Sequence, residues 1–289
     1  MKKILITSIL LVTIIASVLL VLNSRSDQGI LNDLAQKNVI EAEKEPGKTE
    51  VTEKEKAEHI ENEQELKENQ LDEAKEIEES YTIVIDPGHQ AEANHEQEPI
   101  GPGATETKPK VASGTAGVVT EIPEYILTLQ ASLLLEQHLK QKGFDITLTR
   151  LTHDVDISNS ERAAIANELD ADLFLRIHAD GVESAEAKGF SLLVPGNENK
   201  FTQDIYEDSQ AAANAILAKV ENDINLLGNG IFIRDDLSGF NWSDVPVVLV
   251  ELGFMTNPEE DQLLADETYI KKLTGLIAEG VEDFVRKNE

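Results

Sequence analysis

The chain is organised around residues 81–90, which read YTIVIDPGHQ. Its first half is rich in β-branched residues and is bounded by turn formers, which is the composition of a buried β-strand. Pro87 fixes its own backbone φ angle, and Gly88 permits backbone angles that a Cβ atom forbids. The strand should therefore stop abruptly and present His89 at its carboxyl end. In open α/β sheets, that edge is where ligands bind.

Two later apolar runs end in the same way. Residues 172–178 read DLFLRIH and end on His178, and residues 245–250 read VPVVLV and are followed by Glu251. Each of these terminal side chains can bind a metal ion or transfer a proton. A single buried histidine is usually satisfied by backbone hydrogen bonds, but three strands that end in this manner predict a site.

Composition narrows the chemistry of such a site. The 289 residues include no Cys, which excludes disulfides, thiolate metal ligands and a Cys nucleophile. A transition metal would therefore have to be bound by His and carboxylate groups. The formal net charge is −30, so nucleic acid is excluded as a partner, and anionic lipid headgroups are poor partners for the soluble part.

The first 80 residues differ from the rest of the chain. Lys2 and Lys3 precede residues 4–22, a run of 19 residues without a charge that is long enough to span a bilayer. We therefore expect residues 1–23 to be a transmembrane anchor with its carboxyl end outside the cytoplasm. A cleaved signal peptide is the alternative, and it gives the same extracytoplasmic location, with the chain secreted instead of anchored in the membrane.

Residues 24–80 hold 18 acidic and 8 basic residues, a net charge of 8 − 18 = −10. Such a stretch has too few apolar side chains to form a core, so it predicts an acidic flexible linker, part of which can be helical.

The composition becomes globular over residues 81–289. Strands are expected at 81–85, 145–149, 172–178, 189–194 and 246–250, helices at 123–142, 159–169, 202–222, 258–264 and 267–287, and long loops at 91–122 and 228–244. Strands that alternate with helices predict an α/β domain with a mostly parallel sheet covered on both faces.

Glu124 opens the helix expected at 123–142, where the helix dipole alone favours a carboxylate. It can also point into a cleft, and two His with one carboxylate leave an open coordination position on zinc. Glu121 is the alternative ligand from the same turn.

Glu251 ends a buried strand, where an unpaired carboxylate is costly. It should either form a salt bridge, for instance to Arg176 or Arg162, or serve as an acid–base group with a pKa shifted by burial.

Several runs resemble the zinc-dependent N-acetylmuramoyl-L-alanine amidases known as the amidase 3 family. They are IVIDPGHQ (83–90), a block at 117–150, SNSERAAIAN (158–167), ADLFLRIHAD (171–180) and PVVLVELGFMTNPEED (246–261). The resemblance covers nearly all of residues 81–289. It implies a mixed, mainly parallel sheet of about six strands flanked by helices. It also implies hydrolysis, in peptidoglycan, of the amide between the lactyl group of N-acetylmuramic acid and L-alanine.

The same resemblance implies site residues. The family's ligands for one zinc ion fall on His89, Glu124 and His178, and its catalytic carboxylate falls on Glu251. Gln90 and Asp180 depart from the commonest family pattern. Neither change removes a ligand, so the implied reaction is unaffected, but the preferred form of the substrate is left open. Two other functions stay open at this point: a catalytically silent domain that binds the cell wall or regulates it, and a zinc peptidase acting within the stem peptide.

Overall fold

The computed structural model describes residues 81–287, and the predictions for residues 1–23 and 24–80 lie outside this range. None of the helices within 81–287 combines the length and the apolar character needed to cross a membrane.

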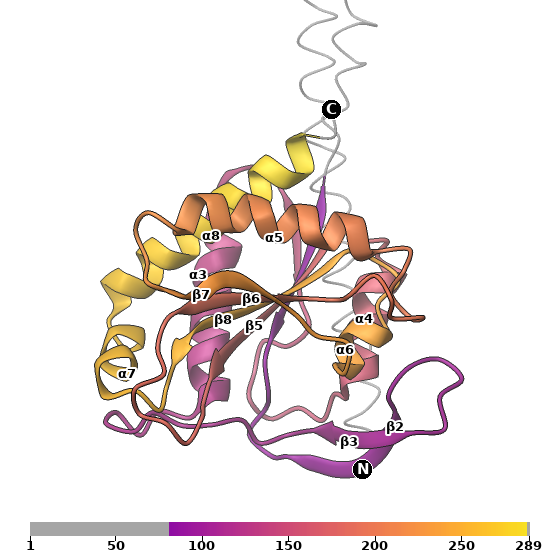
Figure 1. The fold of residues 1–289 in the computed structure, drawn as a ribbon, viewed down its shortest axis with the longest axis horizontal. Coiled ribbons are helices and arrows are strands. Elements are labelled where there is room, and N and C mark those ends of the chain that lie inside the picture. The colour runs from indigo at the N-terminus through magenta and orange to yellow at the C-terminus, as the bar shows by residue number, and fades with distance from the viewer. Residues whose placement is uncertain (1–80, 288–289) are drawn as a thin grey trace, which may run out of the picture. The chain divides into compact units, whose positions relative to one another are not determined.

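A six-stranded sheet forms the centre of the domain (Figure 1). In the order in which they lie side by side, its strands are β4 (Asp145–Leu148), β1 (Thr82–Pro87), β5 (Leu173–Asp180), β8 (Val247–Phe254), β6 (Phe190–Val194) and β7 (Leu226–Ile233). The first four are parallel to one another, β6 is antiparallel to β8, and β7 is parallel to β6. The predicted mixed, mainly parallel α/β sheet is confirmed.

The first strand behaves as its sequence predicts. β1 pairs with β4 on one side and with β5 on the other, and Ile83, Val84 and Ile85 have no exposed surface. Side chains of successive residues point to opposite faces of a sheet, so an uninterrupted apolar run belongs to a strand that is covered on both faces.

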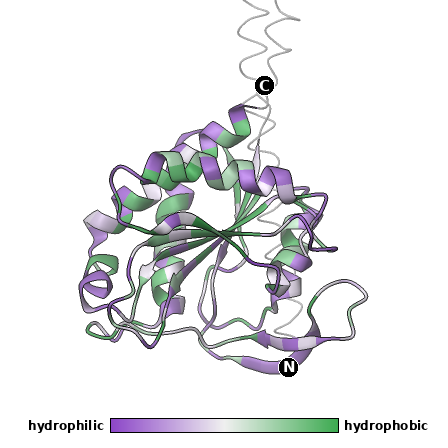
Figure 2. Cartoon of the chain, in the orientation of Figure 1, coloured by the Kyte–Doolittle hydropathy of each residue, from purple (hydrophilic) through white to green (hydrophobic). Residues whose placement is uncertain are grey.

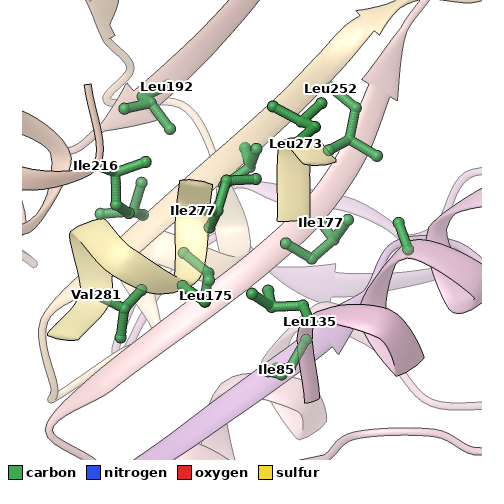
Figure 3. Packing of buried hydrophobic residues seen from close by; sticks show 14 of the residues in the cluster. Ile85, Leu135, Leu175, Ile177, Leu192, Ile216, Leu252, Leu273, Ile277 and Val281 are labelled. Atoms are coloured by element: carbon green, nitrogen blue, oxygen red, sulfur yellow. The ribbon is translucent and has the colours of Figure 1, made fainter. Parts of the chain in front are cut away.

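Helices cover both faces of the sheet (Figure 1). Three long helices pack on one face: α3 (Glu124–Gln141), α5 (Tyr206–Val220) and α8 (Glu267–Arg286). On this side, Figure 3 shows Leu175 and Ile177 of β5 facing Leu135 of α3 and Ile277 of α8. Each fully buried Leu or Ile contributes about 1.5–3 kcal/mol through removal of apolar surface from water.

The opposite face carries a smaller core around Phe174 and Phe240. It is covered by α4 (Asn159–Glu168) and the short α6 (Ser238–Asn241), while α7 (Pro258–Leu264) follows β8. Ser158 caps α4 and forms a reciprocal capping box with Glu161.

The predicted loop at 91–122 contains a two-stranded antiparallel hairpin, β2 (Asn94–Pro99) with β3 (Thr107–Val111). Figure 2 shows the central strands in green and this hairpin largely in purple, so the hairpin lacks the apolar alternation by which strands are predicted. Trp242 and Asn241, at the end of α6, donate hydrogen bonds to the carbonyls of Pro99 and Ile100. Contacts with other elements thus hold the hairpin in place.

The loop predicted at 228–244 is also wrong in part, because β7 runs through its start. Gly228 and Gly230 interrupt the apolar pattern, and both have positive φ angles, at 55° and 82°. Glycines weaken a strand signal in sequence even where an irregular strand forms.

Candidate active site

His89, Glu124 and His178 converge at the carboxyl edge of the parallel strands. Each offers one atom capable of binding a metal ion, and these three atoms lie within 4.8 Å of one another. His89 follows β1, His178 lies near the end of β5, and Glu124 begins α3. Glu121, the alternative carboxylate, is exposed and is not part of this group. His95 and His138 are not part of it either.

The turn after β1 places His89. The unusual backbone angle falls on His89 itself, with a φ of 58°, whereas the sequence places the conformational freedom at Gly88. His89 Nδ1 lies 2.8 Å from the carbonyl oxygen of Ala112, just after β3. A carbonyl can only accept, so Nδ1 carries a proton and Nε2 is the ring atom left to bind a metal ion. Nε2 lies 3.1 Å from Glu124 Oε1.

Two backbone amides fix Glu124. The N–H of Thr115 donates to Oε2 at 3.0 Å, and the N–H of Ala179 donates to Oε1 at 3.2 Å. Burial alone would raise the pKa of Glu124, but hydrogen bonds with His178 and His89 outweigh it and lower the pKa well below its usual range. Glu124 is therefore a carboxylate at neutral pH.

Gly88 makes room for His178. A Cβ atom at Gly88 would lie 2.5 Å from Cε1 of the His178 ring, closer than real Cβ contacts. His178 Nδ1 lies 3.1 Å from Glu124 Oε1, and Nε2 has no hydrogen-bond partner. Burial lowers the pKa of His178 to about 4, so the ring is neutral at neutral pH, as a metal ligand must be.

These three side chains fit a zinc ion. Zinc bonds of about 2.0–2.1 Å at tetrahedral angles would separate ligand atoms by about 3.3 Å. The two separations of 3.1 Å from Glu124 Oε1 are close to that value. Two imidazoles and one carboxylate, without thiolate, are a donor set used by hydrolytic zinc sites that keep a position open.

Glu251 lies beside this group. It is in register with His178 on the neighbouring parallel strand, so the two side chains project from the same face of the sheet. Its Oε2 atom is buried and has no hydrogen-bond partner. Burial raises the pKa of Glu251 well above its usual range, and the negative charges of Glu124 and Asp180 raise it further.

The salt bridge considered for Glu251 is not formed within the described residues. Arg162 and Arg176 both bind the carboxylate of Asp86 instead, at 2.7 Å and 2.9 Å. Thr149 donates a third hydrogen bond to Asp86 at 2.6 Å. Sequence reasoning missed this buried network, although an acid inside an apolar strand signals that cationic partners must exist.

The departure from the family pattern at Gln90 has a structural explanation. Gln90 is 1% exposed, and its side-chain oxygen accepts hydrogen bonds from Arg162 and from the N–H of Ile157. The side chain thus ties the turn that carries His89 to the segment before α4.

The fold and the site are those of an α/β hydrolase with a candidate metal-binding group, and the comparisons with known proteins identify its family. A family model described as N-acetylmuramoyl-L-alanine amidase matches residues 83–283. The chain belongs to this family and is a hydrolase of the peptidoglycan amide bond, as the resemblance implies.

Individual relatives agree. N-acetylmuramoyl-L-alanine amidase Rv3717 of Mycobacterium tuberculosis is 30% identical over 218 residues, which cover 70% of this chain and 86% of the relative. A Staphylococcus aureus protein named probable cell wall amidase LytH is 26% identical over 70% of the chain, and the match spans 57% of its own length. The crystal structure of the amidase Ami1 of Mycobacterium abscessus has a TM-score of 0.62 at 27% identity, covering 71% of this chain and 98% of Ami1.

Proposed function

We propose that the chain hydrolyses the amide between N-acetylmuramic acid and L-alanine with one zinc ion held by His89, Glu124 and His178, and with Glu251 as its catalytic carboxylate. The observation that carries the proposal is a buried, unpaired carboxylate oxygen on the strand next to three converging metal-binding side chains. A bound zinc ion would supply Lewis acidity, which polarises a carbonyl and lowers the pKa of water to about 7.

Glu251 has to move a proton in this reaction. Hydrolysis requires one proton to leave the attacking water and one to reach the departing L-alanine nitrogen, because an amine anion is a poor leaving group. Oε2 of Glu251 can accept the first proton and deliver it to that nitrogen. A carboxyl whose pKa is raised by burial holds such a proton more readily than an ordinary surface carboxyl.

Backbone hydrogen bonds fix two of the proposed zinc ligands, Glu124 and His89. The amides of Thr115 and Ala179 restrain rotation of the Glu124 carboxylate, and the carbonyl of Ala112 restrains the ring of His89. Ligands fixed in this way need little reorganisation when the substrate binds.

Paired carboxamide substitutions test the role of Glu251. Glu251→Gln should keep the fold and the zinc content while turnover falls at least ~100-fold, the usual scale for loss of general acid–base catalysis. Glu260→Gln is the matched control, because Glu260 is 8% exposed and accepts hydrogen bonds from the amides of Gly189 and Phe254. It should lower the melting temperature with little change in turnover per folded molecule. Near-normal cleavage by a folded, zinc-loaded Glu251→Gln variant would remove Glu251 from the mechanism.

Zinc content tests the ligand set separately. His178→Ala should lower zinc content and activity together, whereas His95→Ala should change neither, because His95 is exposed and outside the group. Elemental analysis of both variants after dialysis is the measurement. Full zinc occupancy in His178→Ala would overturn the assignment.

We further propose that residues 1–23 anchor the chain in the membrane and that residues 24–80 connect this anchor to the catalytic domain outside the cytoplasm. Support comes from the uncharged run at 4–22 and from the acidic composition that follows it. The cell wall relatives are consistent with action outside the cytoplasm. Protease added to intact spheroplasts should cut within 24–80, and full protection of that segment would contradict this topology.

A further inference from the structure

Arg150 hydrogen-bonds the backbone next to two of the proposed metal ligands, and none of these bonds goes to a ligand side chain. It follows β4 and is 3% exposed. Its Nε donates to the carbonyl of Pro87 at 2.9 Å, and its Nη2 donates to the carbonyl of Gly88 at 2.9 Å. These are the two residues immediately before His89, so Arg150 holds the turn that presents this histidine.

The same guanidinium also reaches the helix that carries Glu124. Nη2 donates to the carbonyl of Tyr125 at 2.8 Å and lies 3.2 Å from Thr128 Oγ1. Thr128, which is fully buried, in turn donates to the carbonyl of Gly88 at 2.8 Å. Gly88 thus accepts hydrogen bonds from both Arg150 and α3. These buried hydrogen bonds connect the turn before His89 to the first turns of the helix that begins at Glu124.

We propose that Arg150, with Thr128, is a positioning residue that sets the spacing between the metal ligands His89 and Glu124. The proposal rests on the metal site put forward above. Its physical basis is that His89 is kept at a positive φ angle, which costs a non-glycine residue free energy and persists only where the surroundings fix it. Without these hydrogen bonds, the turn can relax, and the metal-binding atoms of His89 and Glu124 move apart.

Lysine could not replace Arg150 in this role. A guanidinium donates from several nitrogens in a fixed plane, which lets Arg150 bind carbonyls from two elements at once. Burial and the nearby charge of Arg162 lower the pKa of Arg150 to about 10, so it stays charged at neutral pH. A lysine in the same place would start from a lower pKa and could make fewer of these bonds.

The test is the zinc affinity of the full chain, measured by competition with a chromophoric chelator. We expect Arg150→Met to weaken zinc binding about 10- to 100-fold, the range for groups that orient a metal ligand. Thr128→Val should weaken it about 2- to 10-fold, the effect of one hydrogen bond. In the double variant the loss should be smaller than the product of the two single losses, because both groups act on Gly88.

Two controls separate positioning from general destabilisation. Ser132→Ala removes a buried hydroxyl that has no partner, one turn after Thr128 in α3, and should leave zinc affinity unchanged. Leu139→Ala opens a cavity in the same helix and should lower the melting temperature without weakening zinc binding. In the metal-free protein, Arg150→Met should also speed hydrogen exchange of the Gly88 amide, which is bonded to the carbonyl of Ile177.

The outcomes are distinct. An Arg150→Met variant that melts at a lower temperature but binds zinc as tightly as the wild type would overturn the proposal alone. If Arg150→Met does not fold, unchanged affinity in Thr128→Val overturns it equally. A wild-type chain that bound no zinc would overturn the metal site itself, and the positioning role with it.

Discussion

Replacing Asp86 by Asn should destabilise the domain in a manner that depends strongly on pH. Asp86 has no exposed surface and binds Arg162, Arg176 and Thr149. Both arginine side chains are at most 4% exposed. The substitution keeps the shape of the side chain but removes the charge, so it leaves two buried guanidinium groups without their counter-ion.

Removing one partner of a buried ion pair costs about 3–5 kcal/mol. For a domain of this size, 1 kcal/mol corresponds to roughly 2–4 °C in melting temperature, so Asp86→Asn should melt about 6–20 °C lower at pH 7. Burial alone would raise the pKa of Asp86, but Arg162 and Arg176 hold it well below its usual range. Such a group stabilises the fold above its unfolded pKa of about 3.9, and this contribution is lost as pH falls toward the folded pKa.

Urea unfolding of wild type and Asp86→Asn at pH 7, 5, 4 and 3 measures the effect. The difference in unfolding free energy should be constant between pH 7 and 5 and should shrink below about pH 4. A difference below about 1 kcal/mol at pH 7, the scale of an exposed ion pair, would contradict the reasoning. So would a difference that stayed the same at pH 3.

Two glycine substitutions should differ in their effects: one should weaken zinc binding, and the other should stabilise the fold. Gly88→Ala places a Cβ atom 2.5 Å from the ring of His178 and should weaken zinc binding at least ~10-fold, as measured by chelator competition; unchanged affinity would mean that the ring has room to move. Gly275→Ala, within α8, meets nothing closer than 3.7 Å and should raise stability by about 0.5–1 kcal/mol in urea unfolding, with zinc affinity unchanged. A loss of stability there would refute the reading of that contact.

The sequence predicts which residues form the candidate site better than it predicts the hydrogen bonds that hold them in place. His89, His178 and Glu251 each follow a visible apolar run, and the structure places all three at one edge of the sheet. The positive φ angle of His89 carries no signal in sequence, and Arg150, which binds the two preceding carbonyls, lies far along the chain. Pairing of groups so far apart in the chain depends on the tertiary fold.

The sequence does contain a clue that β6 runs antiparallel to the parallel strands. Nine residues, 181–189, separate β5 from β6. A parallel return requires a crossover of a dozen or more residues, usually with a helix, so this short connection favours an antiparallel strand. The hairpin β2–β3 offers no comparable clue, because its strands are polar and are held by contacts with α4 and α6.

The three proposed ligands lie far apart along the chain, at 124 − 89 = 35 and 178 − 124 = 54 residues from one another. Bringing them together requires β1 and β5 to pair and α3 to dock, and such long-range closures are costly in chain entropy and slow. We therefore expect the binding pocket to be complete only once the sheet has assembled. Zinc fingers, by contrast, remain unfolded without their ion. Here the apo-protein should keep its far-ultraviolet circular dichroism in excess chelator, and the metal can join a domain that has already finished folding.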